Sequence, residues 1–372
     1  MRIGFDAKRL FKNFTGLGNY SRTLVSNLNS HFPDQSYFLY TPDYQENIRT
    51  KEYLEQSNIH IRTPRQNNRL LWRTKGVMQD IAEDGLDIYH GLSNEIPFRG
   101  SNTSTKFVVT IHDLIFKHYP QTYKLTDRTI YNTKFKYACK QADHIIAVSE
   151  HTRQDIVALY GIAPKKISVV HQSCNTKFFS NDKVVKPVYL PNQYLLYVGS
   201  VIERKNLLGI IEALSHLKDS EKIPLVVVGS GKSYLKKVLQ RIKELKLQEL
   251  IIFKNDIRDI EELKGLYQHA QMMIYPSFYE GFGIPIIESL LCETPVITSK
   301  TSALPEAAGP GAHYINPKQT QEIAEGIRLL QTDVSYRNEL VSKGKKYVMN
   351  EFHPSVTSDK LMKLYLDLLQ CH

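Results

Sequence analysis

Short apolar runs alternate with helix-like segments along the whole of this sequence. Each run is a block of Val, Ile, Leu, Phe, Met or Tyr bounded by Gly, Pro, Asp or a small polar residue, which is typical of a strand buried on both faces of a parallel sheet. Segments with apolar residues at helical spacing, such as Gln154–Tyr160 and Leu207–Leu217, lie between the runs. The alternation predicts an α/β fold with parallel sheets. The runs are RIGFDA (2–7), YFLYT (37–41), IHIRT (59–63), DIYHG (87–91), KFVVTIHD (106–113), HIIAVS (144–149), ISVVHQ (167–172), LLYVG (195–199), LVVVGSG (225–231), IIFKN (251–255), MMIYPS (272–277), PVITS (295–299) and HYIN (313–316).

The runs form two series, and the chain between them has a different composition. Residues 179–193, FSNDKVVKPVYLPNQ, are polar and contain two prolines, which is typical of a link between domains. A chain of 372 residues is also longer than one ordinary core accommodates. We therefore expect two doubly wound, Rossmann-like domains, over residues 1–180 and 190–354, with ligands at the carboxyl ends of their strands.

Composition and charge exclude several classes of protein. The formal net charge is +10; residues 1–186 hold 26 Lys and Arg against 17 Asp and Glu, and residues 187–372 hold 22 against 21. A basic first half favours either general solubility or an anionic partner, but its cations are dispersed, so nucleic acid is not expected. The four cysteines show no metal-site or disulfide spacing, which favours the reducing cytoplasm. Neither a membrane-spanning run nor a signal peptide is apparent.

Residues 280–288, EGFGIPIIE, carry the most informative local pattern. They follow a predicted strand, their glycines permit tight turns, and Pro285 suits the first position of a helix. The amides of residues 281–284 are then predicted to form a helix N-terminus, which attracts phosphate. Glu288 is expected within about the first turn of that helix, where a carboxylate either offsets the dipole or accepts hydrogen bonds from sugar hydroxyls. A capped helix alone explains neither the second glycine nor Glu280.

This string resembles the E-x7-E motif of retaining glycosyltransferases of the GT-B fold, in particular glycosyltransferase family 4. Two departures, QSCNTKFF (172–179) and FHPS (352–355), concern the expected hinge and last helix rather than the donor site. The resemblance covers essentially the full length and implies the GT-B fold: two Rossmann-like domains that face a central cleft, the first completed by a helix over 355–372. The other stretches that agree with the family, in order, are TGLGNYSRTLV (15–25), TIHDL (110–114), VSEHTRQDI (148–156), GSVIERKNLLGIIEAL (199–214), VVVGSGK (226–232) and SALPE (302–306).

A nucleotide-sugar donor leaves as a nucleoside diphosphate, so negative charge accumulates on two phosphates in the transition state. Enzymes of the other common glycosyltransferase fold hold a divalent metal with an Asp-x-Asp motif, and this sequence has none. Cationic side chains and backbone amides are then expected to stabilise the phosphates without a metal or other cofactor. Arg204 and Lys205, after the strand LLYVG, are the natural pair, with a solvated surface pair as the alternative.

Gly16 and Gly18 are expected to let the backbone of the first domain approach the diphosphate. A Gly-x-Gly pair also permits a dinucleotide-binding fingerprint, as in an NAD(P)-dependent oxidoreductase, with Asp43 as the ribose-binding acid. Ser21 stands at the third glycine position, and an insert separates the strand from the glycines, which weakens this alternative without removing it.

The resemblance implies roles for further residues. His112, after the strand FVVTI, contacts the donor sugar near the reacting carbon; a hydrogen-bonded structural histidine is the alternative. Glu280 lies beside the transferred sugar and Glu288 binds the ribose hydroxyls, while the leaving phosphate itself deprotonates the acceptor. His112, Glu280, Arg204 and Lys205 are thus the expected catalytic residues. The other expected donor contacts are the loop residues Gly281, Phe282, Gly283 and Ile284, and the backbone of Asn255 and Ile257 for the nucleobase, where a plain turn is the alternative.

The sequence therefore predicts a retaining, metal-independent hexosyltransferase. GDP-mannose is the first expectation for the donor and a UDP-sugar the second. The basic first domain favours a lipid-diphosphate-linked oligosaccharide acceptor at the inner face of the cytoplasmic membrane, in polysaccharide or lipopolysaccharide assembly. Residues 67–80, NNRLLWRTKGVMQD, are typical either of a peripheral contact with an anionic membrane or, as we favour, of a helix packed on its own domain. A catalytically inactive sugar-nucleotide-binding homologue is the remaining alternative.

Overall fold

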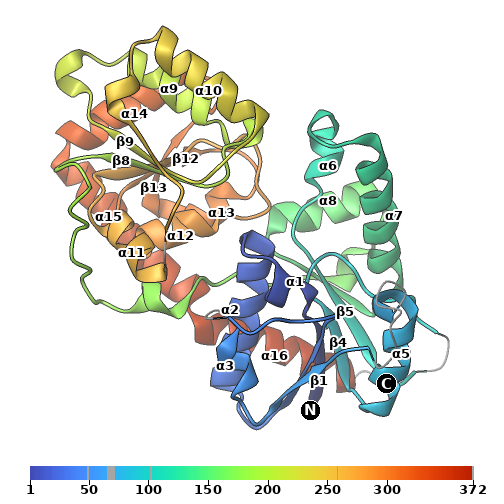
Figure 1. The fold of residues 1–372 in the computed structure, drawn as a ribbon. Coiled ribbons are helices and arrows are strands. Elements are labelled where there is room, and N and C mark those ends of the chain that lie inside the picture. The colour runs from blue at the N-terminus through green and yellow to red at the C-terminus, as the bar shows by residue number, and fades with distance from the viewer. Residues whose placement is uncertain (48–49, 65–71, 101–102, 258, 371–372) are drawn as a thin grey trace. The chain divides into compact units, whose positions relative to one another are not determined.

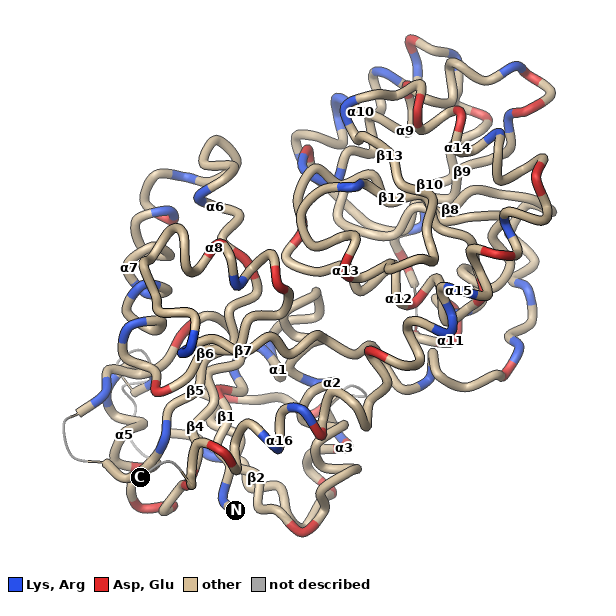
Figure 2. The backbone as a smooth tube through the Cα atoms, turned by 180° about the vertical axis from the view of Figure 1, so that it is seen from behind, with Lys and Arg blue, Asp and Glu red and all other residues tan. Residues whose placement is uncertain are grey.

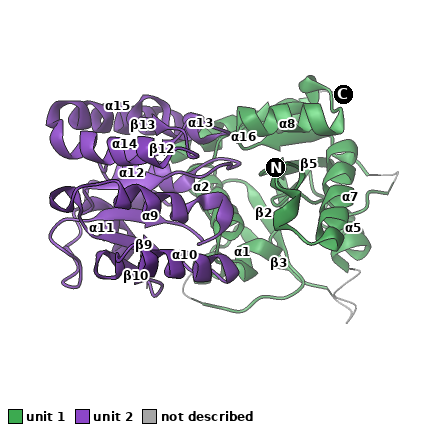
Figure 3. Cartoon of the chain, turned by 90° about the horizontal axis from the view of Figure 1, so that it is seen from above, with its two compact units in different colours: residues 1–173, 354–372 green, residues 174–353 purple. Residues whose placement is uncertain are grey.

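The structure, a computed structural model, describes residues 1–47, 50–64, 72–100, 103–257 and 259–370. The chain divides into two compact units (Figure 3). Unit 1 comprises Met1–Ser173 and Pro354–His372, and unit 2 comprises Cys174–His353. Every apolar run that was predicted to be a strand is one, which confirms the predicted fold class of two doubly wound α/β units.

Unit 1 is built on a seven-stranded parallel sheet of order β3-β2-β1-β4-β5-β6-β7 (Figure 1). Six of these strands follow the order of a Rossmann sheet, whose ligand crevice lies where the order reverses, between β1 and β4. The strands are β1 (Arg2–Asp6), β2 (Ser36–Tyr40), β3 (Ile59–Arg62), β4 (Ile88–Gly91), β5 (Lys106–Ile111), β6 (His144–Ala147) and β7 (Ile167–Val169).

Helices cover both faces of this sheet, because alternate residues of its central strands are buried on opposite sides. Val108 packs in one core with α1, α2 and α16, whereas Val109 packs in another with α7 and α8. This two-sided burial is why the strands are continuously apolar. The helices are α1 (Lys8–Lys12), α2 (Gly16–His31), α3 (Lys51–Leu54), α5 (Val77–Glu83), α6 (Ile115–His118), α7 (Leu125–Gln141), α8 (Glu150–Tyr160) and α16 (Pro354–Gln370).

Unit 2 repeats the architecture with a six-stranded parallel sheet of order β10-β9-β8-β11-β12-β13. Its order reverses between β8 and β11, so the loops after these two strands form the corresponding crevice. The strands are β8 (Leu195–Val198), β9 (Leu225–Val228), β10 (Ile251–Lys254), β11 (Met272–Tyr275), β12 (Val296–Ser299) and β13 (Ala312–Ile315).

The helices of unit 2 also lie on both sides of their sheet. Helices α9, α10 and α14 share one apolar core with the sheet, and α12 packs with α11, α13 and α15 on the other side (Figure 1). The helices are α9 (Leu207–Ser215), α10 (Ser233–Glu244), α11 (Ile260–Gln268), α12 (Ile284–Leu291), α13 (Leu304–Ala308), α14 (Thr320–Thr332) and α15 (Val334–Phe352).

The division between the units falls after Ser173, before the link expected at 179–193. The chain after Ser173 packs on unit 2, because α11 and its surroundings hold it. The buried ammonium of Lys264 donates to the carbonyls of Lys177 and Ser180 at 2.9 and 3.0 Å, and the amide of Val184 donates to the Gln268 side chain at 2.8 Å. Polar contacts of this kind leave no apolar pattern in the sequence.

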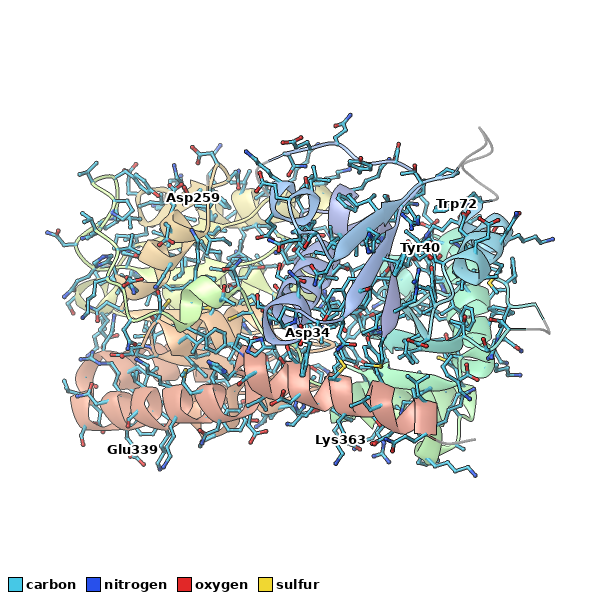
Figure 4. All side chains as sticks on the ribbon, turned by 90° about the horizontal axis from the view of Figure 1, so that it is seen from below. Asp34, Tyr40, Trp72, Asp259, Glu339 and Lys363 are labelled. Carbon is cyan, nitrogen blue, oxygen red and sulfur yellow. The ribbon has the colours of Figure 1, made fainter. Side chains whose placement is uncertain are left out.

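Residues 72–80 pack on unit 1, as the favoured interpretation of 67–80 expected, while residues 67–71 lie outside the described residues. Trp72 is 8% exposed, its indole donates to Asp80 at 2.5 Å, and its ring lies 6.4 Å from that of Tyr40, centroid to centroid (Figure 4).

Candidate functional site

Two loops of unit 2 bring the motif residues together at the point where the strand order reverses. The loop after β8 carries Arg204 and Lys205, and the loop after β11 carries Glu280. Because β8 and β11 are adjacent and parallel, their carboxyl ends lie side by side. The expected association of these three residues is therefore a consequence of the sheet topology.

Glu280 forms a buried ion cluster with both cations. Its carboxylate lies 2.7 Å from Nη1 of Arg204 and 3.1 Å from Nζ of Lys205, and the hydroxyls of Tyr275 and Ser277 donate to it at 3.1 and 3.0 Å. Burial raises the pKa of Glu280, but the charges of Lys205 and Arg204 outweigh burial and bring this pKa to about 2. Glu280 is therefore an anion throughout the neutral range.

The loop that carries the cations is fixed by hydrogen bonds at both ends. Arg204 donates to the carbonyl of Tyr279, and its own carbonyl accepts from the amide of Phe278 at 2.9 Å. Asn206 has a φ of +57°, a conformation that asparagine tolerates, and its side chain caps α9 by accepting from the amide of Gly209 at 3.1 Å. The same side chain donates to the carbonyl of Pro317 at 2.8 Å, which ties the loop to the end of the sheet.

Two glycines let the backbone pass close to the side chain of Lys205. Gly199 and Gly229 have φ values of +150° and +138°, which L residues rarely adopt. A Cβ on Gly229 would lie 2.1 Å from the carbonyl oxygen of Gly199, and a Cβ on Gly199 would lie 3.2 Å from Nζ of Lys205. The backbone therefore approaches the ammonium more closely than any other residue would allow.

Helix α12 begins at Ile284, one residue before the expected start at Pro285, which lies in its first turn. Its first turn contains no acidic residue, so the amides at its start keep the partial positive charge that attracts phosphate. Glu288, expected within about the first turn, is the fifth residue of the helix and lies one position beyond that turn. Its carboxylate accepts from the hydroxyl of Tyr267 at 2.8 Å, and burial raises the pKa of Glu288 to about 7 despite this hydrogen bond.

The two glycines of unit 1 differ in what they permit. Gly16 is the first residue of α2 and has no atom within 4 Å of a Cβ placed on it, whereas a Cβ on Gly18 would lie 1.6 Å from the carbonyl oxygen of Asn13. Only Gly18 is sterically required. Asp43, the ribose-binding acid of the dinucleotide alternative, forms an ion pair with Lys12.

His112 is 6% exposed, and both of its ring nitrogens have partners within unit 1. A carbonyl only accepts, so Nε2 carries the proton that is donated to the carbonyl of Leu92 at 2.8 Å, and Nδ1 accepts from the Gln172 amide at 3.2 Å. Burial lowers the pKa of His112 to about 4, although the Leu92 hydrogen bond opposes the shift. His112 is therefore a neutral imidazole of defined tautomer, and its contact with a donor sugar stays a prediction.

The segment expected to contact the nucleobase is an irregular stretch that follows β10. The ammonium of Lys254 pairs with Asp256 at 2.8 Å and lies 4.3 Å from the centroid of the Tyr189 ring. Asn255 is exposed and Ile257 half-buried. The nucleobase role of their backbone groups stays a prediction.

Comparisons with known proteins bear directly on this arrangement. The family model Glycosyltransferase Family 4 matches residues 14–178, and Glycosyl transferases group 1 matches residues 179–347. The O-antigen chain mannosyltransferase B of Escherichia coli is 30% identical over 69% of this chain and 68% of its own length. The chain belongs to glycosyltransferase family 4. The O-antigen chain mannosyltransferase RfbU of Salmonella typhimurium is also 30% identical, over 63% of this chain and 64% of its own length, slightly less than two thirds.

Solved structures confirm the GT-B fold of this family 4 member. A glycosyltransferase from Rickettsia africae superposes with a TM-score of 0.74 over 100% of this chain and 99% of its own, at 19% identity. HepE of Anabaena, solved in complex with UDP, superposes with a TM-score of 0.73 over 99% and 100% of the two chains, at 16% identity. Family membership also decides against the oxidoreductase alternative.

Some residues of this family 4 site were not predicted from the sequence. Tyr275 and Ser277, which donate to Glu280, stand in the strand-like run MMIYPS, where they looked like ordinary strand-end residues. Ser302 accepts the amide hydrogen of Glu280 at 3.0 Å from the stretch SALPE. Their only signal in the sequence is a position at or after the end of a strand, which many residues of other roles share.

No described helix combines the length and the apolar character that a membrane crossing needs. Within the same residues, no group of three or more His, Cys, Asp and Glu is arranged to hold a metal ion.

Proposed function

We propose that the protein is a retaining hexosyltransferase that uses a nucleoside-diphosphate sugar. GDP-mannose is the first candidate donor, because the two relatives named above are described as mannosyltransferases. A UDP-sugar is the second, because HepE has been solved with UDP. The proposed acceptor is a glycan or a lipid-diphosphate-linked oligosaccharide of polysaccharide or lipopolysaccharide assembly, as in the O-antigen systems of those relatives.

The buried cluster of Arg204, Lys205 and Glu280 is the observation that carries the proposal. Two cations and the start of α12 together offer fixed positive charge to a departing diphosphate. Such preorganised charge stabilises a transition state strongly, because it needs no reorganisation during the reaction. Glu280 holds the two side chains in place before the donor binds.

The charge of Glu280 limits the part it can take in the reaction. A carboxyl group with a pKa of about 2 is not an acid that donates a proton at neutral pH. The acceptor hydroxyl oxygen is proposed to form its bond to the anomeric carbon as the bond from that carbon to the phosphate oxygen breaks. The hydroxyl proton passes to that phosphate oxygen on the same face, so configuration is retained. Glu280 then orients the sugar and stabilises developing positive charge.

The remaining donor contacts are proposed from the family resemblance. Glu288 accepts hydrogen bonds from the ribose, the backbone of Asn255 and Ile257 contacts the base, and His112 contacts the transferred sugar. Gly16 and Gly18 are proposed to admit the donor diphosphate near the start of α2.

The acceptor is proposed to carry negative charge. Lys and Arg exceed Asp and Glu by 26 to 17 in residues 1–186, and Figure 2 shows them spread over many elements of unit 1. Such a distribution attracts an anionic lipid surface or a diphosphate-bearing acceptor without defining one contact point. We propose that the protein works at the inner face of the cytoplasmic membrane.

Donor cleavage tests the function without knowledge of the acceptor. The protein is incubated with GDP-mannose, GDP, UDP-glucose or UDP, and both binding and slow release of the nucleoside diphosphate are measured. Arg204→Ala is expected to lower the release rate by about 100-fold, in the range observed when one transition-state donor is removed. The matched control is Arg328→Ala, which removes a half-exposed arginine of α14 that pairs with Glu221.

The outcomes separate the alternatives. Equal rates for the Arg204 and Arg328 variants would contradict the proposed role of the cluster. Binding of a nucleotide sugar with no cleavage, even when glycan acceptors are supplied, would identify an inactive homologue. Loss of activity in a chelator would contradict metal independence.

A further inference from the structure

Three contacts fix the plane of the His112 ring. Two of them, to Leu92 and Gln172, come from the loops that follow β4 and β7. The third is the ring of Tyr20 on α2, which meets the imidazole edge to face with 4.5 Å between ring centroids. Such a contact restricts rotation and tilt of the imidazole about its bond to the backbone.

The hydroxyl of Tyr20 ends a buried chain of hydrogen bonds that crosses unit 1. It lies 2.9 Å from the hydroxyl of Thr110 on β5, which lies 2.7 Å from Nε2 of His90 on β4. Nδ1 of His90 lies 2.6 Å from the hydroxyl of Tyr365 on α16. We call these four residues the Tyr365–Tyr20 chain.

The Tyr365–Tyr20 chain is fully enclosed and internally satisfied. Thr110, His90 and Tyr365 are each 0% exposed, and Tyr20 is 8% exposed. Burial lowers the pKa of His90 to about 3, so its ring is neutral and has one N–H. Together with the three hydroxyls it supplies four protons for three hydrogen bonds, so all three bonds form whichever way the chain is directed.

An apolar core does not require these polar groups. His90 lies beside Phe5, with ring centroids 6.0 Å apart, in a core that is otherwise almost entirely apolar. Burying an imidazole and three hydroxyls there is unfavourable unless every one is hydrogen-bonded, and an apolar set of similar volume would pack without that constraint. What the polar chain adds is a fixed spacing between α16, the two central strands and α2.

We propose that Tyr365 and His90 are positioning residues for His112, acting through Thr110 and Tyr20. Thr110 and His112 are two residues apart at the end of β5, so their side chains project to the same side. Tyr20 contacts Thr110 there through its hydroxyl and His112 through its ring. Helix α16, whose opposite face carries the exposed Lys363 (Figure 4), thereby sets the position of a residue assigned to the donor sugar. The inference rests on the proposed function for the role of His112.

Tyr365→Phe tests the proposal, because it removes one hydroxyl and keeps the ring. We expect turnover of the donor to fall about tenfold, since small misplacements of a reacting group have effects of this size or larger, with the KM for the donor changed by less than about twofold. The matched control is Tyr37→Phe. Tyr37 is also 0% exposed in the same core, but its hydroxyl donates to the carbonyls of Leu28 and Phe32, outside the Tyr365–Tyr20 chain.

A second variant and a spectroscopic measurement keep the test independent of folding and of the assay. Tyr20→Phe breaks the Tyr365–Tyr20 chain at its other end. If the four residues act as one unit, a single break already removes the effect, so the double variant with Tyr365→Phe is expected to lose no more turnover than either single variant. In protein labelled with nitrogen-15 at histidine, the His112 ring signals should move in both single variants and stay in place in Tyr37→Phe.

Each result decides a different question. Additive losses in the double variant, or a Tyr365→Phe protein that matches Tyr37→Phe in turnover and in its His112 signals, would overturn the inference. If the wild type cleaves no donor, the proposed function fails, while the movement or constancy of the His112 signals still decides whether the Tyr365–Tyr20 chain positions that ring.

Discussion

At the scale of single residues, the two glutamates of the E-x7-E motif have opposite electrostatic states. Glu280 is held as an anion by Lys205 and Arg204. Glu288 is half-buried and accepts a hydrogen bond from Tyr267, and burial raises its pKa to about 7. The sequence places both glutamates correctly relative to the strand before them. It could not predict the difference, because that difference depends on cations from a loop about 75 residues upstream.

Donor affinity should depend on pH through Glu288. Below about pH 7 the folded carboxyl is protonated, and above it the carboxylate accepts hydrogen bonds from ribose hydroxyls more strongly. The affinity for GDP-mannose should therefore rise between pH 6 and pH 8. Glu288→Gln should bind more weakly at pH 8 and show a flat profile, as measured by calorimetry.

Intact GDP-mannose is the right probe, because its diphosphate diester has no proton to lose in this range, unlike free GDP. Glu293→Gln is the control, since Glu293 is a surface residue paired with Lys345, an ion pair that lowers its pKa. A profile that keeps the wild-type slope in Glu288→Gln would refute the assignment of Glu288 to the ribose.

At the scale of elements, the sequence predicts strands better than it predicts what joins them. Every apolar run became a strand, because a strand buried on both faces needs apolar residues at every position. The packing of residues 174–190 on unit 2 was not predictable, since it depends on the buried ammonium of Lys264 and the side chain of Gln268. The start of α2 at Gly16 is an intermediate case. The sequence shows Gly16 and Gly18, but it does not show which of them the backbone packing requires to be glycine.

Gly16 and Gly18 should respond differently to alanine. A Cβ at Gly18 meets the carbonyl oxygen of Asn13 at 1.6 Å, so Gly18→Ala must displace backbone and should lower the free energy of unfolding by about 1–3 kcal/mol. Gly16→Ala has open space and should leave it unchanged or raise it by up to about 1 kcal/mol. Urea unfolding measures both, and equal effects would contradict this account of the helix start.

At the scale of the whole molecule, unit 1 depends on a segment that the chain supplies last. Helix α16 contributes Leu361, Met362 and Tyr365 to the core around β1 and α2, and all three are at most 4% exposed. Burying side chains of this size stabilises a fold by about 1.5–3 kcal/mol each. Together these three side chains contribute an amount comparable to the whole free energy of unfolding of a domain, which is roughly 5–15 kcal/mol.

A chain that ends at His353 should therefore lose unit 1 and keep unit 2. Unit 2 contains its own sheet, its own core and the cluster of Arg204, Lys205 and Glu280, none of which α16 supplies. In the shortened chain we expect the backbone amides of strands β1 to β7 to exchange their hydrogens rapidly and those of β8 to β13 to stay protected from exchange. GDP binding through unit 2 should persist, although weakened by the loss of any donor contacts that unit 1 supplies, while donor cleavage should cease. Lys363→Ala, which alters only the exposed face of α16, should keep both units protected. Protection of β1 to β7 in the shortened chain would show that α16 is dispensable to unit 1.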